Sequence, residues 1–171
     1  MIITSTKPEF VAGADLKMIL RNQGGDPAEM LKISAGLNAL FRRIETNGKP
    51  VVAAINGTAL GGGLEICLAC HYRVALNNPK SKLGLPEVKV GLLPGAGGTQ
   101  RLPRMIGMQA ALPLILEGKE LSPKDALGLG IVDAVAETHE EMFEKAFAWI
   151  AANPKPVKPW DEVNKKTGKI Q

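Results

Sequence analysis

Aromatic residues are scarce in this sequence: Phe, Trp and Tyr together make up 4% of the 171 residues. Proteins that bind single-stranded nucleic acid commonly stack the bases on aromatic side chains, so the composition disfavours a nucleic-acid partner. The core must be built instead from Leu, Ile, Val, Ala and Met, within a chain that is 45% hydrophobic and 22% charged. Those values are ordinary for one globular domain.

Long apolar runs are also missing. No stretch approaches the roughly 18 consecutive apolar residues that a membrane-spanning helix needs, so we expect no membrane span. Residues 1–4 do not show the basic segment and apolar stretch of a secretion signal. We therefore expect a cytoplasmic protein.

Cysteine occurs only twice, as Cys67 and Cys70, and with His71 these residues form C-x-x-C-H, the attachment pattern of c-type haem. Haem attachment normally accompanies export, and the apolar surroundings suit packing, so we interpret both cysteines as buried free thiols.

The nucleotide-binding patterns G-x-G-x-x-G and G-x-x-x-x-G-K-[ST] are absent as well, although the chain has 19 glycines. We predict no nicotinamide site, no metal site and no bound cofactor.

The stretch from Lys49 to Ala69 carries the clearest local signal. Residues 51–55 form a continuous apolar run, which predicts a strand buried on both faces. Gly61, Gly62 and Gly63 then lead into a helix predicted over residues 64–69. The first N–H groups of a helix have no partner within it, so a ligand oxygen can approach them where no side chain intervenes.

Glu65 lies further into this helix, just beyond Leu64. A carboxylate beside free N–H groups pairs an acid/base group with a site that stabilises developing negative charge. The alternative is a glycine-rich turn in which Glu65 only favours the helix dipole.

Strand and helix signals alternate along the chain, which predicts an α/β fold with right-handed winding. We expect strands at residues 2–5, 72–76 and 131–135, and a loop region over residues 83–98 because it holds five Gly and two Pro. Helices are expected at the short segment after Asp15, from the Asp26-Pro27 cap to Asn47-Gly48, at 99–106, at 109–117, from Ser122-Pro123, and at 140–152 after a Thr138 cap.

Two helices show apolar stripes at helical spacing. The first stripe is Met30, Ile33, Leu37, Leu40, Phe41 and Ile44, and the second is Phe143, Ala146, Phe147 and Ile150. Residues 153–171 change in composition, with three prolines and five lysines. They predict a basic tail or the start of a linker, which we interpret as solvated, after a domain over residues 1–152.

Four segments together resemble the crotonase superfamily, whose members include enoyl-CoA hydratases and isomerases. They are FVAGADLKMI at 10–19, INGTALGGGLE at 55–65, LGLPEVKVGLLPGAGGTQRL at 83–102 and LGLGIVDAV at 127–135. The resemblance implies a ββα spiral core with helices toward the C-terminus. The wording CHYRVA and the Trp160-containing tail are similar to the hydratase part of bacterial multifunctional fatty-acid oxidation proteins.

The resemblance implies a set of site residues. The N–H groups of Ala14 and Gly62 would form an oxyanion hole for the thioester oxygen of an acyl-CoA, with Glu65 as the base and Glu87 as the acid that hydrate a 2-enoyl-CoA. The substrate path would be lined by Ala12, Gly13, Asp15, Leu16, Lys17 and Gly61. Coenzyme A would be part of the substrate and not a separate cofactor.

Alternatives stay open for several of these residues. Glu87 could be a loop acid paired with Lys89, and Lys17 could be merely solvated. Acids at both family positions favour a hydratase over an isomerase, which by resemblance can work with one acid at the position of Glu87.

The resemblance also implies several tens of residues before the segment that matches Ile2, so we expect a domain without its first strands. A non-catalytic remnant or subunit is therefore the second hypothesis. Family members commonly assemble as trimers or larger homo-oligomers such as hexamers, or within a fatty-acid oxidation complex, and the same is expected here.

Overall fold

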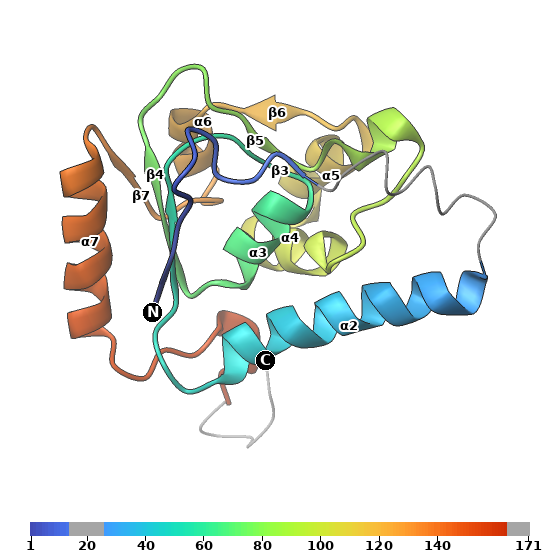
Figure 1. Ribbon diagram of the computed structural model, residues 1–171, viewed down its shortest axis with the longest axis horizontal. Helices are drawn as coiled ribbons and strands as arrows, with labels where there is room; N and C mark the ends of the chain where they lie inside the picture. The colour runs from blue at the N-terminus through green and yellow to red at the C-terminus, as the bar shows by residue number, and fades with distance from the viewer. Residues whose placement is uncertain (14–25, 164–171) are drawn as a thin grey trace.

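The computed structural model of this protein describes residues 1–13 and 26–163. The short helix expected after Asp15 lies outside these ranges. Figure 1 shows the elements, which are β1 (Ile2–Ile3), α2 (Pro27–Thr46), β2 (Val52–Ile55), β3 (Ala59–Leu60), α3 (Gly62–Ala69), β4 (Tyr72–Leu76), β5 (Leu83–Gly84), the 3₁₀ helix η1 (Pro86–Val90), α4 (Gly98–Ile106), α5 (Met108–Leu116), β6 (Glu120–Leu121), α6 (Pro123–Gly128), β7 (Ala134–Ala136), α7 (His139–Ala152) and the 3₁₀ helix η2 (Pro159–Asp161).

The first sheet is parallel throughout, with the strand order β1-β2-β4-β7. The predicted strands at 51–55 and 72–76 are confirmed as β2 and β4, which pair from Val52 opposite Tyr72 to Ile55 opposite Ala75. Every residue of β2 is buried. Helix α7 covers one face of this sheet and α3 lies on the other (Figure 1). Burial on both faces explains why β2 is uniformly apolar rather than alternating.

A second sheet has the order β3-β5-β6, with β3 parallel to β5 and β5 antiparallel to β6. It holds the start of the region predicted as an irregular loop over 83–98, since β5 is Leu83–Gly84. That region contains two short elements, β5 and η1, which the density of Gly and Pro concealed. The second sheet thereby places η1 beside the turn that joins β3 to α3.

Local capping chemistry sets the helix starts, as predicted. Asp26 accepts a hydrogen bond from Ala28 N–H at 2.9 Å before α2, and Thr138 Oγ1 accepts one from Glu141 N–H at 3.1 Å before α7. Ser122 caps α6 in the same way, through the N–H of Asp125 at 3.2 Å. These bonds satisfy N–H groups that the helices themselves leave free.

The last strand was predicted in the wrong place. Strand β7 covers Ala134–Ala136 instead of 131–135, because the N–H groups of Ile131 and Val132 both point back to the Ala126 carbonyl at the end of α6. Ile131 and Val132 are apolar because they are buried in the core. Phe147 also departs from the prediction, since its side chain on α7 is 62% exposed.

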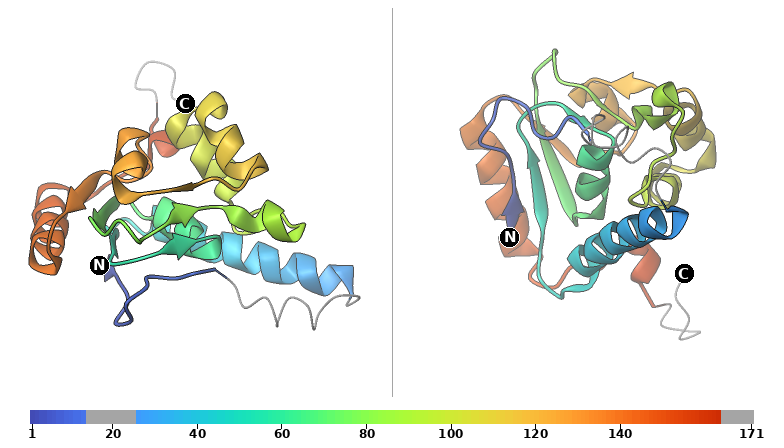
Figure 2. Two further views of the ribbon diagram at one scale, coloured as in Figure 1. Left: turned by 90° about the horizontal axis from the view of Figure 1, so that it is seen from above. Right: turned by 45° about the vertical axis from the view of Figure 1, so that its right-hand side comes forward.

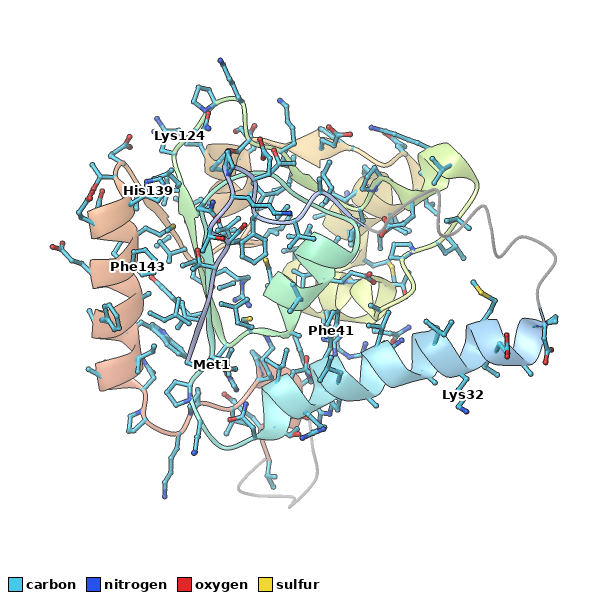
Figure 3. The ribbon with its side chains drawn as sticks, in the orientation of Figure 1. Met1, Lys32, Phe41, Lys124, His139 and Phe143 are labelled. Atoms are coloured by element: carbon cyan, nitrogen blue, oxygen red, sulfur yellow. The ribbon has the colours of Figure 1, made fainter. Side chains whose placement is uncertain are left out.

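Helix α2 uses only the end of its apolar stripe within the chain. Phe41 packs against Ala69 and Ala96, and Figure 3 shows it on the side of α2 that faces the body, with Lys32 on the opposite side. In the left view of Figure 2, the first turns of α2 lie at the edge of the molecule. The first four residues of the stripe are between 43% and 54% exposed: Met30, Ile33, Leu37 and Leu40.

The tail is docked on the body of the protein at two of its described residues, Lys158 and Asp161. Lys158 is only 3% exposed, and its Nζ donates to the carbonyl oxygens of Leu68 and Cys70 at 2.8 Å each. These carbonyls lie at the C-terminal end of α3, where the helix dipole favours a cation. Asp161 forms an ion pair with Arg42 of α2. The expectation of a solvated tail is therefore wrong at Lys158 and Asp161, whereas Lys155 and Val157 are exposed as expected, and 164–171 lie outside the described ranges.

The interpretation of the cysteines is confirmed. Cys67 and Cys70 are free and buried, and burial raises the pKa of the Cys70 thiol to about 12. Nowhere in residues 1–13 and 26–163 do three or more His, Cys, Asp or Glu side chains gather as a metal would require. No helix within these residues is long and apolar enough to cross a membrane.

Candidate active site

The turn between β3 and α3 forms the centre of the candidate site. Gly61 has φ +54°, a conformation that L side chains rarely adopt, and its N–H donates to the Gly84 carbonyl at 2.9 Å. A Cβ at this position would lie 2.9 Å from Glu87 Oε1. Glycine at 61 therefore lets the turn and the carboxyl of η1 lie in contact.

Gly62 is the first residue of α3 and is the predicted N–H donor of the oxyanion hole. Helix geometry supplies no acceptor for this N–H, and none of the loop and cap bonds between described residues uses it. A Cβ at Gly62 would meet no atom of the described chain within 4 Å. Within the described part of the chain, the start of α3 thus presents an N–H donor that has no acceptor.

The first segment of the chain lies directly across this helix start. Leu60 N–H donates to the Val11 carbonyl at 2.9 Å, and Val11 forms a parallel bridge with Ala59. A Cβ on Gly63 would overlap the Val11 carbonyl. These contacts bring the predicted substrate residue Gly13 to the turn, since its Cα lies 3.7 Å from where a Cβ on Gly61 would be.

The other predicted residues of this segment differ in how much the structure says of them. Ala12 is exposed and Gly13 is half-buried. Ala14, Asp15, Leu16 and Lys17 lie outside the described residues, so the second donor of the oxyanion hole stays a prediction.

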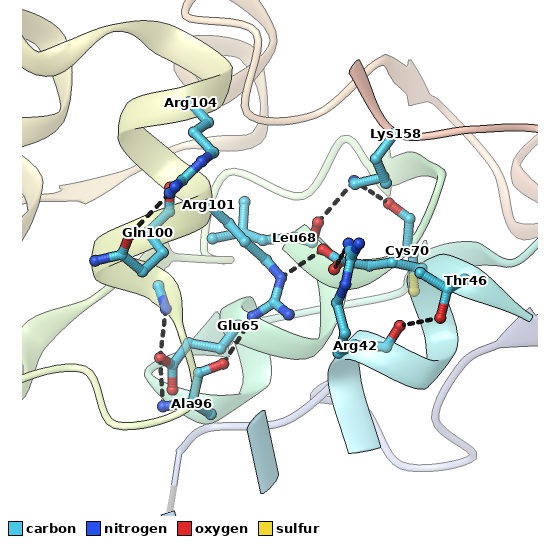
Figure 4. Close-up of polar contacts among 12 residues, drawn as sticks. Arg42, Thr46, Glu65, Leu68, Cys70, Ala96, Gln100, Arg101, Arg104 and Lys158 are labelled. Atoms are coloured by element: carbon cyan, nitrogen blue, oxygen red, sulfur yellow. Dashed lines mark hydrogen bonds and ion pairs between the residues drawn. The ribbon is translucent and has the colours of Figure 1, made fainter. Parts of the chain in front are cut away.

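Glu65 is 2% exposed and its carboxyl is held by main-chain groups. The N–H groups of Ala96 and Gly98 both donate to Oε1, each at 2.8 Å (Figure 4). Gly98 is the first residue of α4, so Oε1 sits at a helix N-terminus. Burial raises the pKa of Glu65, while the two N–H bonds and the charge of Arg101 act in the opposite direction.

Glu87 lies on η1 in a contrasting environment. Its Oε2 is buried and has no hydrogen-bond partner among the described residues. Burial raises the pKa of this carboxyl, its own backbone N–H lowers it, and the negative charge of Glu65 raises it further. Both acids flank the same turn, since Glu65 N–H donates to the Gly61 carbonyl at 3.0 Å and a Cβ on Gly61 would lie 2.9 Å from Glu87 Oε1. A buried oxygen without a partner is uncommon in native proteins and is frequent at functional sites.

The alternative that pairs Glu87 with Lys89 is wrong. Lys89 Nζ donates instead to Glu120 Oε1 at 2.8 Å. The side chain of Lys89 is 50% exposed, which is typical of a surface ion pair.

Sequence reasoning missed the N–H groups of Ala96 and Gly98 that hold Glu65, and Arg101, whose charge lowers the pKa of Glu65. The run from Gly95 to Gly98 completes no nucleotide-binding pattern and lies in the segment predicted as a loop. Its position immediately before a helix was the available signal, because the N-terminal N–H groups of that helix need an acceptor.

The turn therefore combines an N–H donor that no described residue accepts with two nearby acids in unlike surroundings. Such a set can stabilise charge on a carbonyl oxygen while protons move to and from a substrate. The family model described as enoyl-CoA hydratase/isomerase matches residues 1–158. The chain belongs to this family. Its α/β fold is the one found in the solved structures of the family's hydratases.

Individual relatives agree with this assignment. The fatty acid oxidation complex subunit alpha of Aliivibrio fischeri is 55% identical over 135 residues, which are 78% of this chain and 19% of that protein. The subunit alpha of Shewanella halifaxensis is 50% identical over 139 residues, which are 81% of this chain and 19% of that protein.

Two solved structures show the same architecture. The enoyl-CoA hydratase from Bacillus anthracis has a TM-score of 0.77 at 39% identity, covering 88% of this chain and 57% of that one. The enoyl-CoA hydratase from Thermoplasma volcanium has a TM-score of 0.81 at 32% identity, covering 88% of this chain and 58% of that one. This chain thus spans about a fifth of the curated family members and less than three-fifths of these hydratases.

Proposed function

We propose that this family member is an enoyl-CoA hydratase that adds water across the double bond of 2-enoyl-CoA thioesters in fatty-acid β-oxidation. The observation that carries the proposal is the pair Glu65 and Glu87, two acids that flank the Gly61 turn beside the N–H of Gly62, which has no acceptor among the described residues. Relatives named as fatty acid oxidation complex subunits support the substrate class.

The two environments support a division of roles. Glu65 Oε1 accepts two N–H bonds and feels the charge of Arg101, which favour the ionised form of a base. Glu87 has a buried oxygen without a partner among the described residues and a negative neighbour, which favour the protonated form of an acid. Pairs of carboxyls whose surroundings differ in this way are a common basis for acid and base roles.

In the proposed reaction, Glu65 takes a proton from water as the water oxygen bonds to the β-carbon. Negative charge then develops on the thioester oxygen, where the N–H of Gly62 and, by resemblance, that of Ala14 donate to it. Glu87 delivers its proton to the α-carbon, and a proton passes from Glu65 to Glu87 to restore the starting state. Removing one such oxyanion donor typically costs about 10²-fold to 10³-fold in rate.

Substrate-binding roles are proposed for Ala12, Gly13 and Gly61 at the turn, and for Asp15, Leu16 and Lys17 next to Ala14. The contact between Gly13 and Gly61 supports this assignment for the described part. Coenzyme A would enter as part of the substrate.

The decisive experiment is an absorbance assay with crotonyl-CoA. We expect the enoyl thioester band to decrease when folded protein is added. If folded protein leaves crotonyl-CoA unchanged but converts a 3-enoyl-CoA to the 2-enoyl isomer, the protein is an isomerase. If it changes neither substrate, the second candidate holds, a non-catalytic subunit.

An assembly of several copies is also proposed, and the exposed stripe Met30, Ile33, Leu37 and Leu40 of α2 supports it. An apolar helix face of this kind commonly marks a protein interface. Sedimentation velocity should show a homo-oligomer for the unmodified protein and a smaller species for Leu37→Glu. The variant Lys32→Glu, on the other side of the helix, is the matched control. A monomer in all three samples rejects this interface.

A further inference from the structure

The segment Gly95 to Gly98 provides the N–H groups that hold Glu65, and its own carbonyls accept hydrogen bonds from side chains of α2 and α4. On the α2 side, Ser34 Oγ and Asn38 Nδ2 donate to the Gly95 carbonyl at 2.7 and 2.8 Å. On the α4 side, Arg101 Nη1 donates to the Ala96 carbonyl at 2.9 Å. The position of the Glu65 carboxyl therefore depends on side chains that do not touch it.

Arg101 is the most strongly held of these side chains. It is 7% exposed, and its Nε donates to Glu45 Oε1 at 2.7 Å. Glu45 is 4% exposed and also accepts from Arg42 Nη1 at 2.8 Å through Oε2. The guanidinium carbon lies 6.0 Å from the centre of the Phe41 ring. Figure 4 shows the bond from Arg101 to the Ala96 carbonyl, with Arg42 nearby.

A buried ion pair of this kind is weak evidence for stability, because the cost of removing two charges from water offsets most of their attraction. A planar guanidinium with donors in fixed directions is well suited to hold two acceptors in a set geometry. Here the acceptors are Glu45 on one side and the carbonyl of Ala96 on the other. Arg101 thus links α2 to the segment that carries the N–H donors of Glu65.

We propose that Arg101, fixed by Glu45, is a positioning residue that aims the N–H groups of Ala96 and Gly98 at Glu65 Oε1 and so leaves Oε2 for the attacking water. The proposal rests on the proposed hydratase function. Glu65 Oε2 takes part in no hydrogen bond among the described residues, in agreement with this division of the two oxygens.

Arg101 has an electrostatic effect in addition to its geometric one. The charged groups around Glu65 are Arg101 from α4 and Glu87 from η1, with Glu45 of α2 behind Arg101. The positive charge lowers the pKa of Glu65. Removing it should move the titration of Glu65, and the acid limb of kcat/KM, to higher pH.

The test compares four variants. Arg101→Met alone would leave Glu45 buried without its partner and could unfold the protein, so the informative variant is the double substitution Glu45→Gln with Arg101→Met. Arg101→Lys keeps the charge but not the planar fork. Glu45→Gln alone keeps Arg101 itself. Arg104→Met on the exposed side of α4 is the control, because Arg104 bonds only Gln100 among the described residues.

Two readouts are used. The amide resonances of Ala96 and Gly98 report the titration of Glu65 by NMR and need no turnover, and hydration of crotonyl-CoA gives kcat and KM. In the double variant we expect the NMR midpoint at higher pH and a fall in kcat of about 10²-fold at nearly unchanged KM, the usual cost of a misplaced catalytic group. Arg101→Lys should bring the NMR midpoint closer to the wild-type value than it brings kcat, because it keeps the charge only. Glu45→Gln should have a kcat between those of the wild type and the double variant. Arg104→Met should behave as the wild type in both readouts.

The results separate the two proposals. Unchanged amide shifts, midpoint and kcat in a folded double variant would overturn the positioning role, as would a lower melting temperature with no change in the midpoint or in kcat. If the wild-type protein does not hydrate crotonyl-CoA, the proposed function fails, while the NMR titration still decides whether Arg101 sets the state of Glu65.

Discussion

Glu65 and Glu87 show how one residue type acquires two characters within a single site. Both have a pKa raised chiefly by burial. Glu65 is surrounded by main-chain donors at the start of α4, whereas the buried Oε2 of Glu87 has no partner in the described part of the chain. For two side chains of the same residue type, the comparison teaches that the main-chain N–H donors around each carboxyl determine which of the two is more stable as an anion. If the contrast holds, substitutions at and near the two acids should differ in their effects on turnover and stability.

The largest expected effect is on turnover. Glu87→Gln should lower kcat for crotonyl-CoA by about 10²-fold to 10⁴-fold, since an amide cannot deliver the proton. The melting temperature should barely change, because Oε2 of this carboxyl forms no hydrogen bond with any described residue that the variant would lose. Glu65→Gln, with the same change in charge, is the matched variant and should lose activity to a similar extent. Retained activity with a large drop in melting temperature would make Glu87 a structural residue.

Both acids should matter for activity, but only Glu65 should matter much for the free energy of unfolding. Glu65→Ala leaves the buried N–H groups of Ala96 and Gly98 without their acceptor and should reduce the free energy of unfolding by about 2 kcal/mol. Glu87→Ala should change it by less than about 0.5 kcal/mol. Urea unfolding of both variants measures the difference. Equal losses would show that the two environments do not differ as described.

The pH dependence of stability provides a third, smaller test. Because the pKa of Glu87 is raised in the folded state, its protonated form contributes stability below its unfolded pKa, and this contribution is lost as pH rises through the folded pKa. The wild type should therefore lose stability relative to Glu87→Gln as pH rises from about 4 to about 8. Urea unfolding of both proteins across this range gives the difference. A difference that is independent of pH contradicts the raised pKa.

The smallest effect is expected at Lys89. Lys89→Ala breaks only the surface pair with Glu120 and should cost less than about 1 kcal/mol in unfolding. Both kcat and the pH profile should stay as in the wild type. A shift of the profile would mean that Lys89 does act on Glu87.

The sequence predicted the parts of the structure that depend on neighbouring residues. The caps at Asp26, Ser122 and Thr138 are local hydrogen bonds, so their residue types were enough to locate α2, α6 and α7. The uniform apolar run of β2 indicated burial on both faces for an equally local reason. The location of Glu65 and Glu87 in one site came from the resemblance, and their roles remain proposals.

Contacts between distant segments could not be predicted in this way. Lys158 binds carbonyls 90 and 88 positions away, so nothing in the composition of the tail distinguishes it from a solvated lysine. Ile131 and Val132 have the apolar pattern of a strand, but the end of α6 takes their N–H groups. The exposed stripe on α2 has the pattern of a core helix, since periodicity does not say whether the partner lies within the same chain.

The close passage of Val11 over Gly63 has a consequence for anyone who would redesign this protein. At that point one side of the candidate site is made of peptide groups, and peptide groups are the same whatever amino acid is encoded. Substitution can therefore change the size and polarity of the rest of the site. It cannot widen the site at this contact unless the segments that carry Val11 and Gly63 move apart. A library aimed at bulkier thioesters should leave positions 11 and 63 untouched and vary residues elsewhere.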